Sequence, residues 1–201
     1  MKISEAKFAG SSTRVHERPA ERLPEFAFIG RSNVGKSSLI NMLTDNRKLA
    51  KTSSTPGKTK LVNHFRINGT WYLVDLPGYG YAKMPQKERE KLQEIIRDYL
   101  NFSEDMLLLF VLIDCRHDVQ KVDLDFMNEL VDGGIPFAII FTKGDKLGPV
   151  ARQRQIDAYK NHLLQDWAGL PPCLVSSSET GLGKQEILDF IGEVLAGREQ
   201  P

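Results

Sequence analysis

A short segment near residue 30 combines glycine, lysine and serine at a spacing that suits phosphate chemistry. The sequence Gly30-Arg-Ser-Asn-Val-Gly35-Lys36-Ser37 follows the pattern of a glycine, four residues, and then Gly-Lys-Ser/Thr. The apolar run EFAFIG at 25–30 precedes it, and a helical pattern follows it. Glycines let backbone N–H groups turn inward around phosphate oxygens, and a helix N-terminus adds positive potential. We therefore predict a phosphate loop in which Lys36 reaches the β- and γ-phosphates and the Ser37 hydroxyl binds Mg²⁺.

A second candidate metal ligand ends another apolar run. The run WYLVD leads into Asp75-Leu76-Pro77-Gly78, an aspartate at a strand end that is followed by a glycine. Such an aspartate holds Mg²⁺, usually through water, and the N–H of Gly78 could meet the γ-phosphate. Pro-Gly by itself is also a common turn, so the segment gains its meaning from the phosphate loop before it.

Two later segments predict which base the nucleotide carries. TKGD at 142–145 follows the apolar run PFAIIF. Asp145 can accept hydrogen bonds from N1–H and the 2-amino group of guanine, whereas adenine has an acceptor at N1 and no 2-amino group. Lys143 would cover the base plane with its alkyl stem. Backbone N–H groups of SSS at 176–178 can reach guanine O6, although a serine-rich cap before the last helix would look the same.

The elements that must position these segments alternate along the chain. Apolar, β-rich runs occur at 25–30, 61–67, 71–75, 106–114, 136–142 and 172–176. Helical patterns lie at 36–44, 86–101, 121–132, 150–167 and 184–196. Four of the runs are almost continuously apolar, as strands buried on both faces of a parallel sheet are, and NGT at 68–70 predicts a tight hairpin with one antiparallel edge strand. The pattern indicates an α/β three-layer domain whose ligand lies at the carboxyl ends of the strands.

Length and composition predict one domain of a cytoplasmic protein. The chain has 201 residues, is 41% hydrophobic and carries a formal net charge of +1, so overall charge does not attract it to nucleic acid or membranes. Its first ten residues lack the apolar stretch typical of a signal peptide, and its longest apolar run, at 106–113, is too short to span a bilayer. We expect an N-terminal arm at 1–22, the main domain at 23–197 and a tail at 198–201.

Four segments together closely resemble the bacterial EngB family of GTPases, also called YihA or YsxC, within the Era-like group. They are GRSNVGKSSLIN, SSTPGKT, DLPGYGYAK and TKGD, and the resemblance covers roughly residues 8–195. It implies a Ras-like P-loop GTPase fold with a mostly parallel, six-stranded sheet in the order 2-3-1-4-5-6. It also implies Mg²⁺-dependent binding of GTP and GDP, a role in assembling the large ribosomal subunit, and a link to cell division and septation. The expected partner is a ribosomal large-subunit precursor or its rRNA, and a monomer is expected.

The resemblance also assigns site residues by motif. Thr59 would be the switch threonine on Mg²⁺ and the γ-phosphate, a choice that the residues alone leave open between Thr52, Thr55 and Thr59. The implied metal ligands are Ser37, Thr59 and, through water, Asp75. The implied nucleotide-binding residues are Gly30, Arg31, Ser32, Asn33, Val34, Gly35, Lys36, Ser37, Ser38, Gly57, Lys58, Thr59, Lys60, Leu61, Asp75, Leu76, Pro77, Gly78, Thr142, Lys143, Gly144, Asp145, Ser176, Ser177 and Ser178. Two motifs differ from those of commoner GTPases. Thr142 stands in place of an asparagine, and SSS at 176–178 stands in place of Ser-Ala-Lys.

Hydrolysis is expected to be slow. Tyr79 stands where Ras-like enzymes have a glutamine that orients the attacking water, and no arginine is obviously supplied by the chain itself. In Era-like GTPases an asparagine at the position of Asn33 can help to coordinate K⁺, which would supply positive charge. Alternatively, Asn33 only tolerates the backbone conformation of the loop. The predicted catalytic residues are Asn33, Lys36, Thr59 and Gly78.

Basic residues near the phosphate loop suggest an RNA partner. Arg47, Lys48, Lys51, Lys58 and Lys60 stand against a single acidic residue, and Tyr79 and Tyr81 could stack on bases, although solvated switch loops have a similar composition.

Two other functions are compatible with a phosphate loop. The first is a GTP-dependent binding module in septum formation whose hydrolysis is incidental. The second is a small-molecule kinase, which needs an arginine-rich lid, but 115–135 and 145–170 hold only Arg116, Arg152 and Arg154. A kinase would also leave Asp145 without a role.

Overall fold

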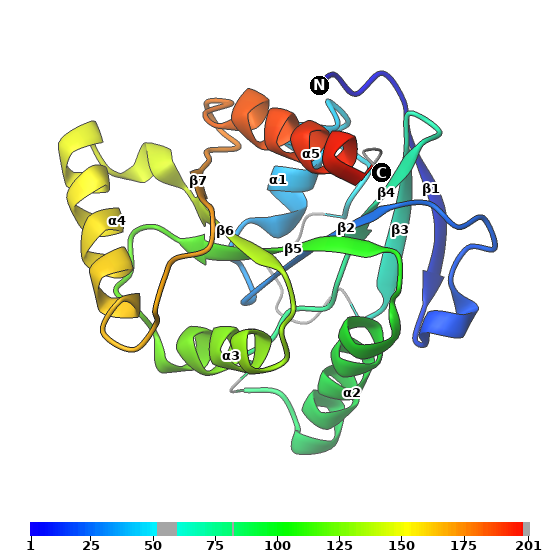
Figure 1. Cartoon of the computed structure of the whole chain (residues 1–201), viewed down its shortest axis with the longest axis horizontal. Helices are drawn as coiled ribbons and strands as arrows, with labels where there is room; N and C mark the ends of the chain where they lie inside the picture. The colour runs from blue at the N-terminus through cyan, green and yellow to red at the C-terminus, as the bar shows by residue number, and fades with distance from the viewer. Residues whose placement is uncertain (52–59, 82, 199–201) are drawn as a thin grey trace.

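The protein is a seven-stranded sheet with helices on both faces (Figure 1). The computed structural model describes residues 1–51, 60–81 and 83–198. The strands are β1 Ala6–Ser12, β2 Glu25–Gly30, β3 Val62–Ile67, β4 Trp71–Asp75, β5 Met106–Asp114, β6 Phe137–Thr142 and β7 Cys173–Val175. The helices are α1 Lys36–Leu43, α2 Gln86–Phe102, α3 Lys121–Asp132, α4 Pro149–Leu163 and α5 Lys184–Arg198. Each element except β1 lies close to the position that its sequence pattern predicted.

The strand order is β1-β3-β4-β2-β5-β6-β7. Without β1 this is the expected order 2-3-1-4-5-6, and β3 is antiparallel to its neighbours as predicted. The sheet has seven strands where six were expected, because part of the predicted arm, Ala6–Ser12, pairs with the outer edge of β3. A strand can add to the unpaired edge of a sheet through main-chain hydrogen bonds alone, without an apolar pattern. The sequence of this segment therefore did not predict a strand. The expected edge strand β3 is therefore second from the edge.

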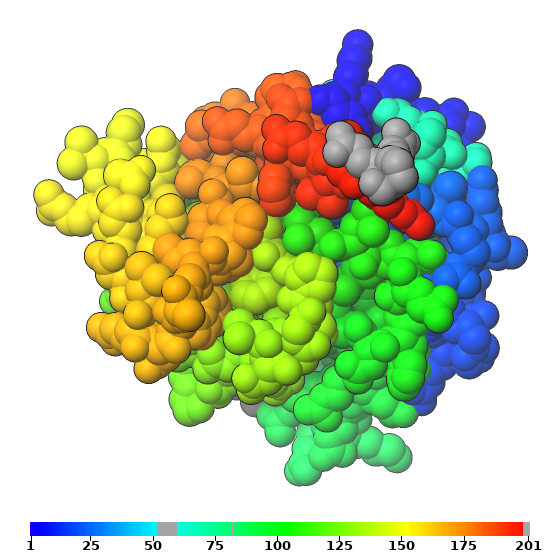
Figure 2. Space-filling model, in the orientation of Figure 1, coloured from blue at the N-terminus to red at the C-terminus, as the bar shows by residue number. Residues whose placement is uncertain are grey.

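Two hydrophobic clusters fill the space between the sheet and its helices. One face packs against α2, α3 and α4, through residues such as Ile96, Met127 and Tyr159. The other packs against α1 and α5, through residues such as Leu39 and Ile187. Figure 1 shows α1 and α5 on one side of the sheet and α2 and α3 on the other, and Figure 2 shows the N-terminal residues against α5. No helix within the described ranges has the length and apolar character needed to cross a bilayer.

The predicted hairpin between β3 and β4 is confirmed. Asn68 and Gly69 have φ values of 50° and 69°, the left-handed conformation that a tight two-residue hairpin needs. By contrast, the fourth helix ends at Leu163, four residues before the predicted end at 167. Trp167 instead packs edge-on against Phe137 at 6.0 Å between ring centroids, and this contact turns the chain back toward the sheet.

A buried carboxylate joins three elements at the end of the sheet where β2 begins. Glu25 accepts hydrogen bonds from the Tyr99 hydroxyl at 2.7 Å and from the Ser103 hydroxyl at 2.8 Å, and it lies 3.2 Å from Nε2 of His64. Burial raises the pKa of Glu25, but the contacts with His64, Tyr99 and Ser103 outweigh it and hold the pKa below its ordinary value. The carboxylate therefore links β2 to β3 and α2.

We expect Glu25→Gln to lower the free energy of unfolding by about 1–3 kcal/mol at pH 7, since hydrogen bonds to a charged group are removed. Because folding depresses the pKa of Glu25, its contribution is present above the unfolded pKa of about 4.3 and is lost as the pH falls through the folded value. Urea unfolding at pH 7 and at pH 3.5 should show the gap between the two proteins shrinking.

The control is Glu21→Gln, which removes an exposed ion pair with Arg66 and should cost well under about 1 kcal/mol. An equal loss of stability at both pH values in Glu25→Gln would contradict the assignment to a charged carboxylate.

Candidate nucleotide site

The predicted phosphate loop has the backbone geometry of an anion cradle. A Cβ on Gly30 would lie 2.8 Å from Cγ1 of Val34 and 3.0 Å from the carbonyl oxygen of Leu112, so only glycine fits. Gly35 has a φ of 102°, which glycine adopts without strain. The helix α1 begins directly afterwards at Lys36, so the N–H groups of its first turn are available to an anion inside the loop.

Two opposite charges meet at the floor of this loop. Lys36 and Asp75 are 9% and 3% exposed, and the ammonium donates to the carboxylate. A carboxylate and the hydroxyl of Ser37 are oxygen ligands of the kind that Mg²⁺ prefers. Within the described ranges, no group of three or more His, Cys, Asp or Glu side chains gathers to hold a metal alone. These residues fit an ion that takes its other ligands from phosphate and water.

The loop after Asp75 packs closely on the first residue of the phosphate loop. A Cβ on Gly78 would lie 2.8 Å from the carbonyl oxygen of Gly30, and the N–H of Tyr79 donates to the same oxygen at 3.3 Å. The Tyr79 ring turns into the core, where it stacks on Phe126 at 4.3 Å between centroids. The side chain that follows Gly78 thus points away from the loop.

The predicted base-binding segment is tied directly to the phosphate loop. The Thr142 hydroxyl donates to the carbonyl of Val34 at 2.7 Å, and Nζ of Lys143 donates to the carbonyl of Asn33 at 2.8 Å. Threonine in place of asparagine at position 142 therefore stabilises the loop, since its short hydroxyl side chain reaches the backbone of the loop. The structure brings the two predicted segments together.

Asp145 is held by the segment that was predicted to lie beside it. The Ser177 hydroxyl donates to the Asp145 carboxylate at 2.6 Å and lowers the pKa of Asp145, with help from Lys146. The N–H of Gly144 donates to the carbonyl of Ser176 at 2.9 Å. The sequence analysis considered only backbone groups in 176–178, but the Ser177 side chain orients the aspartate.

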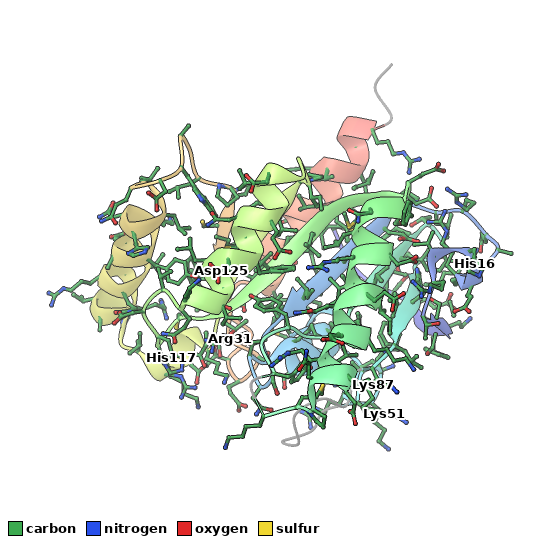
Figure 3. The ribbon with its side chains drawn as sticks, turned by 90° about the horizontal axis from the view of Figure 1, so that it is seen from below. His16, Arg31, Lys51, Lys87, His117 and Asp125 are labelled. Carbon is green, nitrogen blue, oxygen red and sulfur yellow. The ribbon has the colours of Figure 1, made fainter. Side chains whose placement is uncertain are left out.

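Asn33 and Arg31 occupy different environments in the loop. Asn33 is exposed and has a φ of 63°, a left-handed conformation that asparagine tolerates, which supports the simpler explanation of this residue. Arg31 directs its side chain to the start of α3, with Nε 3.1 Å from the Asp123 carboxylate. Figure 3 shows Arg31 beside α3.

Part of the predicted site lies outside the described residues, namely Gly57, Lys58 and Thr59. Of the next two, Lys60 forms an ion pair with Glu88 at 3.2 Å and Leu61 is 40% exposed. The roles of all five in nucleotide binding therefore stay predictions.

Comparison with known proteins assigns the family. A family model described as a 50S ribosome-binding GTPase matches residues 25–143. The probable GTP-binding protein EngB of Phocaeicola vulgatus is 57% identical over 194 residues, which cover 96% of this chain and 97% of that protein. Its counterpart in Porphyromonas gingivalis is 55% identical, and the match covers 96% of each chain. The chain belongs to the EngB family of GTP-binding proteins.

Solved structures agree with this EngB assignment at the level of the fold. A crystal structure of a probable GTP-binding protein engB matches with a TM-score of 0.68 and 23% identity, covering 88% of this chain and 100% of that one. Era in complex with MgGDPNP and nucleotides 1506–1542 of 16S ribosomal RNA matches with a TM-score of 0.66 and 21% identity, covering 85% of this chain and 56% of Era. The predicted family and P-loop GTPase fold are confirmed, and the chain is a GTPase.

Two residues of this EngB chain act near the loop but escaped the sequence analysis. Asp114 ends β5 and lies 3.0 Å from Nζ of Lys143. Burial raises the pKa of Asp114, but Arg116 and Lys143 outweigh it and hold the pKa well below its usual range. Asp123 contacts Arg31. The sequence could have indicated both residues. Asp114 stands at the end of a strand, and Asp123 shares the inward face of its helix with Met127.

One expectation about the tyrosines is wrong for this arrangement. Tyr79 and Tyr81 are only 7% and 8% exposed, so neither ring is available to stack on an RNA base. Their sequence spacing resembles an exposed aromatic loop, but contacts with α3 and with Gly78 bury them.

We expect Thr142→Val to weaken GDP binding about 5- to 30-fold, which corresponds to about 1–2 kcal/mol. Valine keeps the shape of threonine but leaves the Val34 carbonyl without its donor, which loosens the loop. Fluorescent-nucleotide titration measures the change, and Thr142→Ser, which keeps the hydroxyl, should bind within about twofold of the wild type. Wild-type affinity in Thr142→Val would refute this role of the hydroxyl.

Proposed function

We propose that this chain is a Mg²⁺-dependent GTP switch that binds a precursor of the large ribosomal subunit and assists its assembly in the cytoplasm, and that normal cell division depends on it. The match of residues 25–143 to a family described as 50S ribosome-binding GTPases is the main support. The matched region runs from β2 through the phosphate loop to Lys143. Era, a structural relative, was crystallised with ribosomal RNA, which supports the same class of partner.

In this proposal, different described residues bind different parts of the nucleotide. Lys36 binds the phosphates, Ser37 and Asp75 hold Mg²⁺, and Asp145 accepts from the guanine base. The pairing of Lys36 with Asp75 supports these roles, because it brings the two charges together where α1 begins and β4 ends. The bound Mg²⁺ would stabilise charge on the phosphates, and the N–H of Gly78 would donate to the γ-phosphate.

We also propose that the domain at 23–197 works as a monomer with Thr59 as the switch residue. A threonine that meets Mg²⁺ only when the γ-phosphate is present gives a segment that GTP orders and hydrolysis releases. The predicted arm at 1–22 and tail at 198–201 would lie outside this switch, with the arm stabilising the edge of the sheet through β1.

Exposed basic side chains next to α1 support an RNA partner. Arg47, Lys48 and Lys51 follow α1 and are exposed, and none of them forms an ion pair with a described residue. Figure 3 shows Lys51 and Lys87 at the same rim of the molecule. Unpaired cations at one rim can neutralise RNA phosphates and release bound counterions.

Co-sedimentation with purified large ribosomal subunits tests the proposal. Binding should be stronger with a GTP analogue than with GDP and should fall as salt rises. The triple variant Arg47→Gln, Lys48→Gln and Lys51→Gln should lower the slope of log affinity against log salt by about 1 for each RNA phosphate that it no longer neutralises.

The matched control is Arg154→Gln with Lys160→Gln on α4, which packs on the opposite face of the sheet from α1. These changes should leave the slope unaltered. Binding that ignores the nucleotide, or a partner found at the septum in place of the ribosome, would refute the proposal and favour the septal binding module.

We further propose that K⁺ assists hydrolysis through Asn33. Arg31 is paired with Asp123 and Tyr79 is buried in the core, so in this arrangement neither supplies charge to the γ-phosphate. An external cation near the phosphates would fill that need.

Replacing Na⁺ by K⁺ should raise GTP turnover by about tenfold, which corresponds to about 1.4 kcal/mol of additional transition-state stabilisation. Asn33→Gly is the informative variant, because glycine keeps the left-handed backbone at φ 63° while the side-chain oxygen is removed. It should abolish the K⁺ effect and leave the Na⁺ rate near that of the wild type. Equal rates of the wild type in the two salts would rule the idea out.

A further inference from the structure

Asp123 is a buried carboxylate at the start of α3, and it carries none of the roles described above. It is 1% exposed and lies on the face of the helix that also carries Met127 and Leu130. Its Oδ1 accepts from the Tyr79 hydroxyl at 2.8 Å and lies 3.1 Å from Nε of Arg31. Its Oδ2 has no hydrogen-bond partner within the part of the chain that the structure describes. A carboxylate in such a place is costly unless its contacts serve a purpose.

The two partners of Asp123 come from the two loops that surround the phosphates. Arg31 is the second residue of the phosphate loop, and Tyr79 follows Gly78. The same two residues also form a main-chain bridge. One carboxylate thus joins both loops to α3, and no other residue in the described ranges contacts the side chains of both by a hydrogen bond or ion pair.

The pKa shifts of Tyr79 and Asp123 agree with a hydrogen bond from the Tyr79 phenol to the Asp123 carboxylate. Burial and the nearby carboxylate raise the pKa of the Tyr79 phenol well above its usual value, so the phenol keeps its proton and donates. Burial raises the pKa of Asp123, while Tyr79 and Arg31 oppose that shift.

Tyr79 belongs to a buried cluster and also borders a cleft. A cleft of about 720 Å³ between α2 and α3 is lined by Arg31, Tyr79 and Phe126. Stacking on Phe126 fixes the plane of the Tyr79 ring, and the cleft lies beside both side chains. The bonds to Asp123 hold Tyr79 and Arg31 against α3 at the wall of this cleft.

We propose that Asp123 is a positioning residue for GTP hydrolysis. It anchors Tyr79 in the core and Arg31 against α3, and it thereby holds the segment Gly78–Tyr79, with the N–H of Gly78, against the phosphate loop. This inference rests on the proposed contact of that N–H with the γ-phosphate. Hydrolysis needs the Gly78 amide in a defined place when charge develops on the γ-phosphate, whereas tight binding of GDP does not. Loss of the anchor is therefore expected to slow turnover and to leave GDP affinity unchanged.

Two nearly isosteric variants test this role. Tyr79→Phe removes the hydroxyl and keeps the stacked ring, and Asp123→Asn removes the charge and keeps the shape. In steady-state assays each should lower kcat by about 5- to 30-fold, with KM and the Kd for GDP within about twofold of the wild type. The slowing in the double variant should be smaller than the product of the two single effects, because both changes act on the same contact.

Tyr159→Phe is the matched control. This hydroxyl lies in the same hydrophobic cluster and has no hydrogen-bond partner among the described residues, so its removal should not change kcat. If Asp123→Asn fails to fold, Tyr79→Phe still carries the test.

Three outcomes would overturn the proposal. Unchanged or faster turnover in Tyr79→Phe would show that the bond does not position the loop. A loss of GDP affinity as large as the loss of kcat would indicate a role in the fold alone. A similar slowing in Tyr159→Phe would indicate a general response of the core.

Discussion

The parallel pairing of β2 with β4 and β5 brings Gly30, Asp75 and Asp114 to one edge of the sheet, and the nucleotide site depends on this arrangement. Carboxyl ends of parallel strands meet at the same edge, so residues far apart in sequence become neighbours without any special contact between them. The antiparallel strands β1 and β3 extend the sheet beyond β4 and leave this edge unchanged. The loops can therefore differ in sequence between GTPases while the edge that carries them is retained.

At that edge the phosphate loop is held from several directions. Thr142 and Lys143 donate to its carbonyl groups, and Asp123 pairs with the side chain of Arg31. The bond from Thr142 and the Asp123 carboxylate are buried, where hydrogen bonds are strong and an unpaired group is costly. The predicted phosphate loop is consequently linked to the predicted base-binding segment and to α3. A change at any of these contacts is expected to alter how firmly the loop is held.

The opposite end of the sheet has a different role. There Glu25 binds Tyr99, Ser103 and His64, which lie on α2, directly after it and on β3. This network involves no residue of the nucleotide site, so it contributes to stability without responding to GTP. The division is physically sensible, because a switch needs loops with alternative positions at one edge and a fixed core beneath them.

The sequence by itself determined the order and type of most elements, the phosphate loop, and guanine as the base. These features depend on local patterns, namely apolar periodicity, turn residues and short motifs, which the chain encodes within a few residues. Only the tertiary structure decided the rest. The strand β1 forms only because β3 has an unpaired edge to which it can bond. Tyr79 and Tyr81 are buried only because α3 and Gly78 pack against them. The bonds from Thr142 to Val34 and from Asp123 to Tyr79 join residues 108 and 44 positions apart. Such contacts depend on where side chains point after folding, and no local pattern records that.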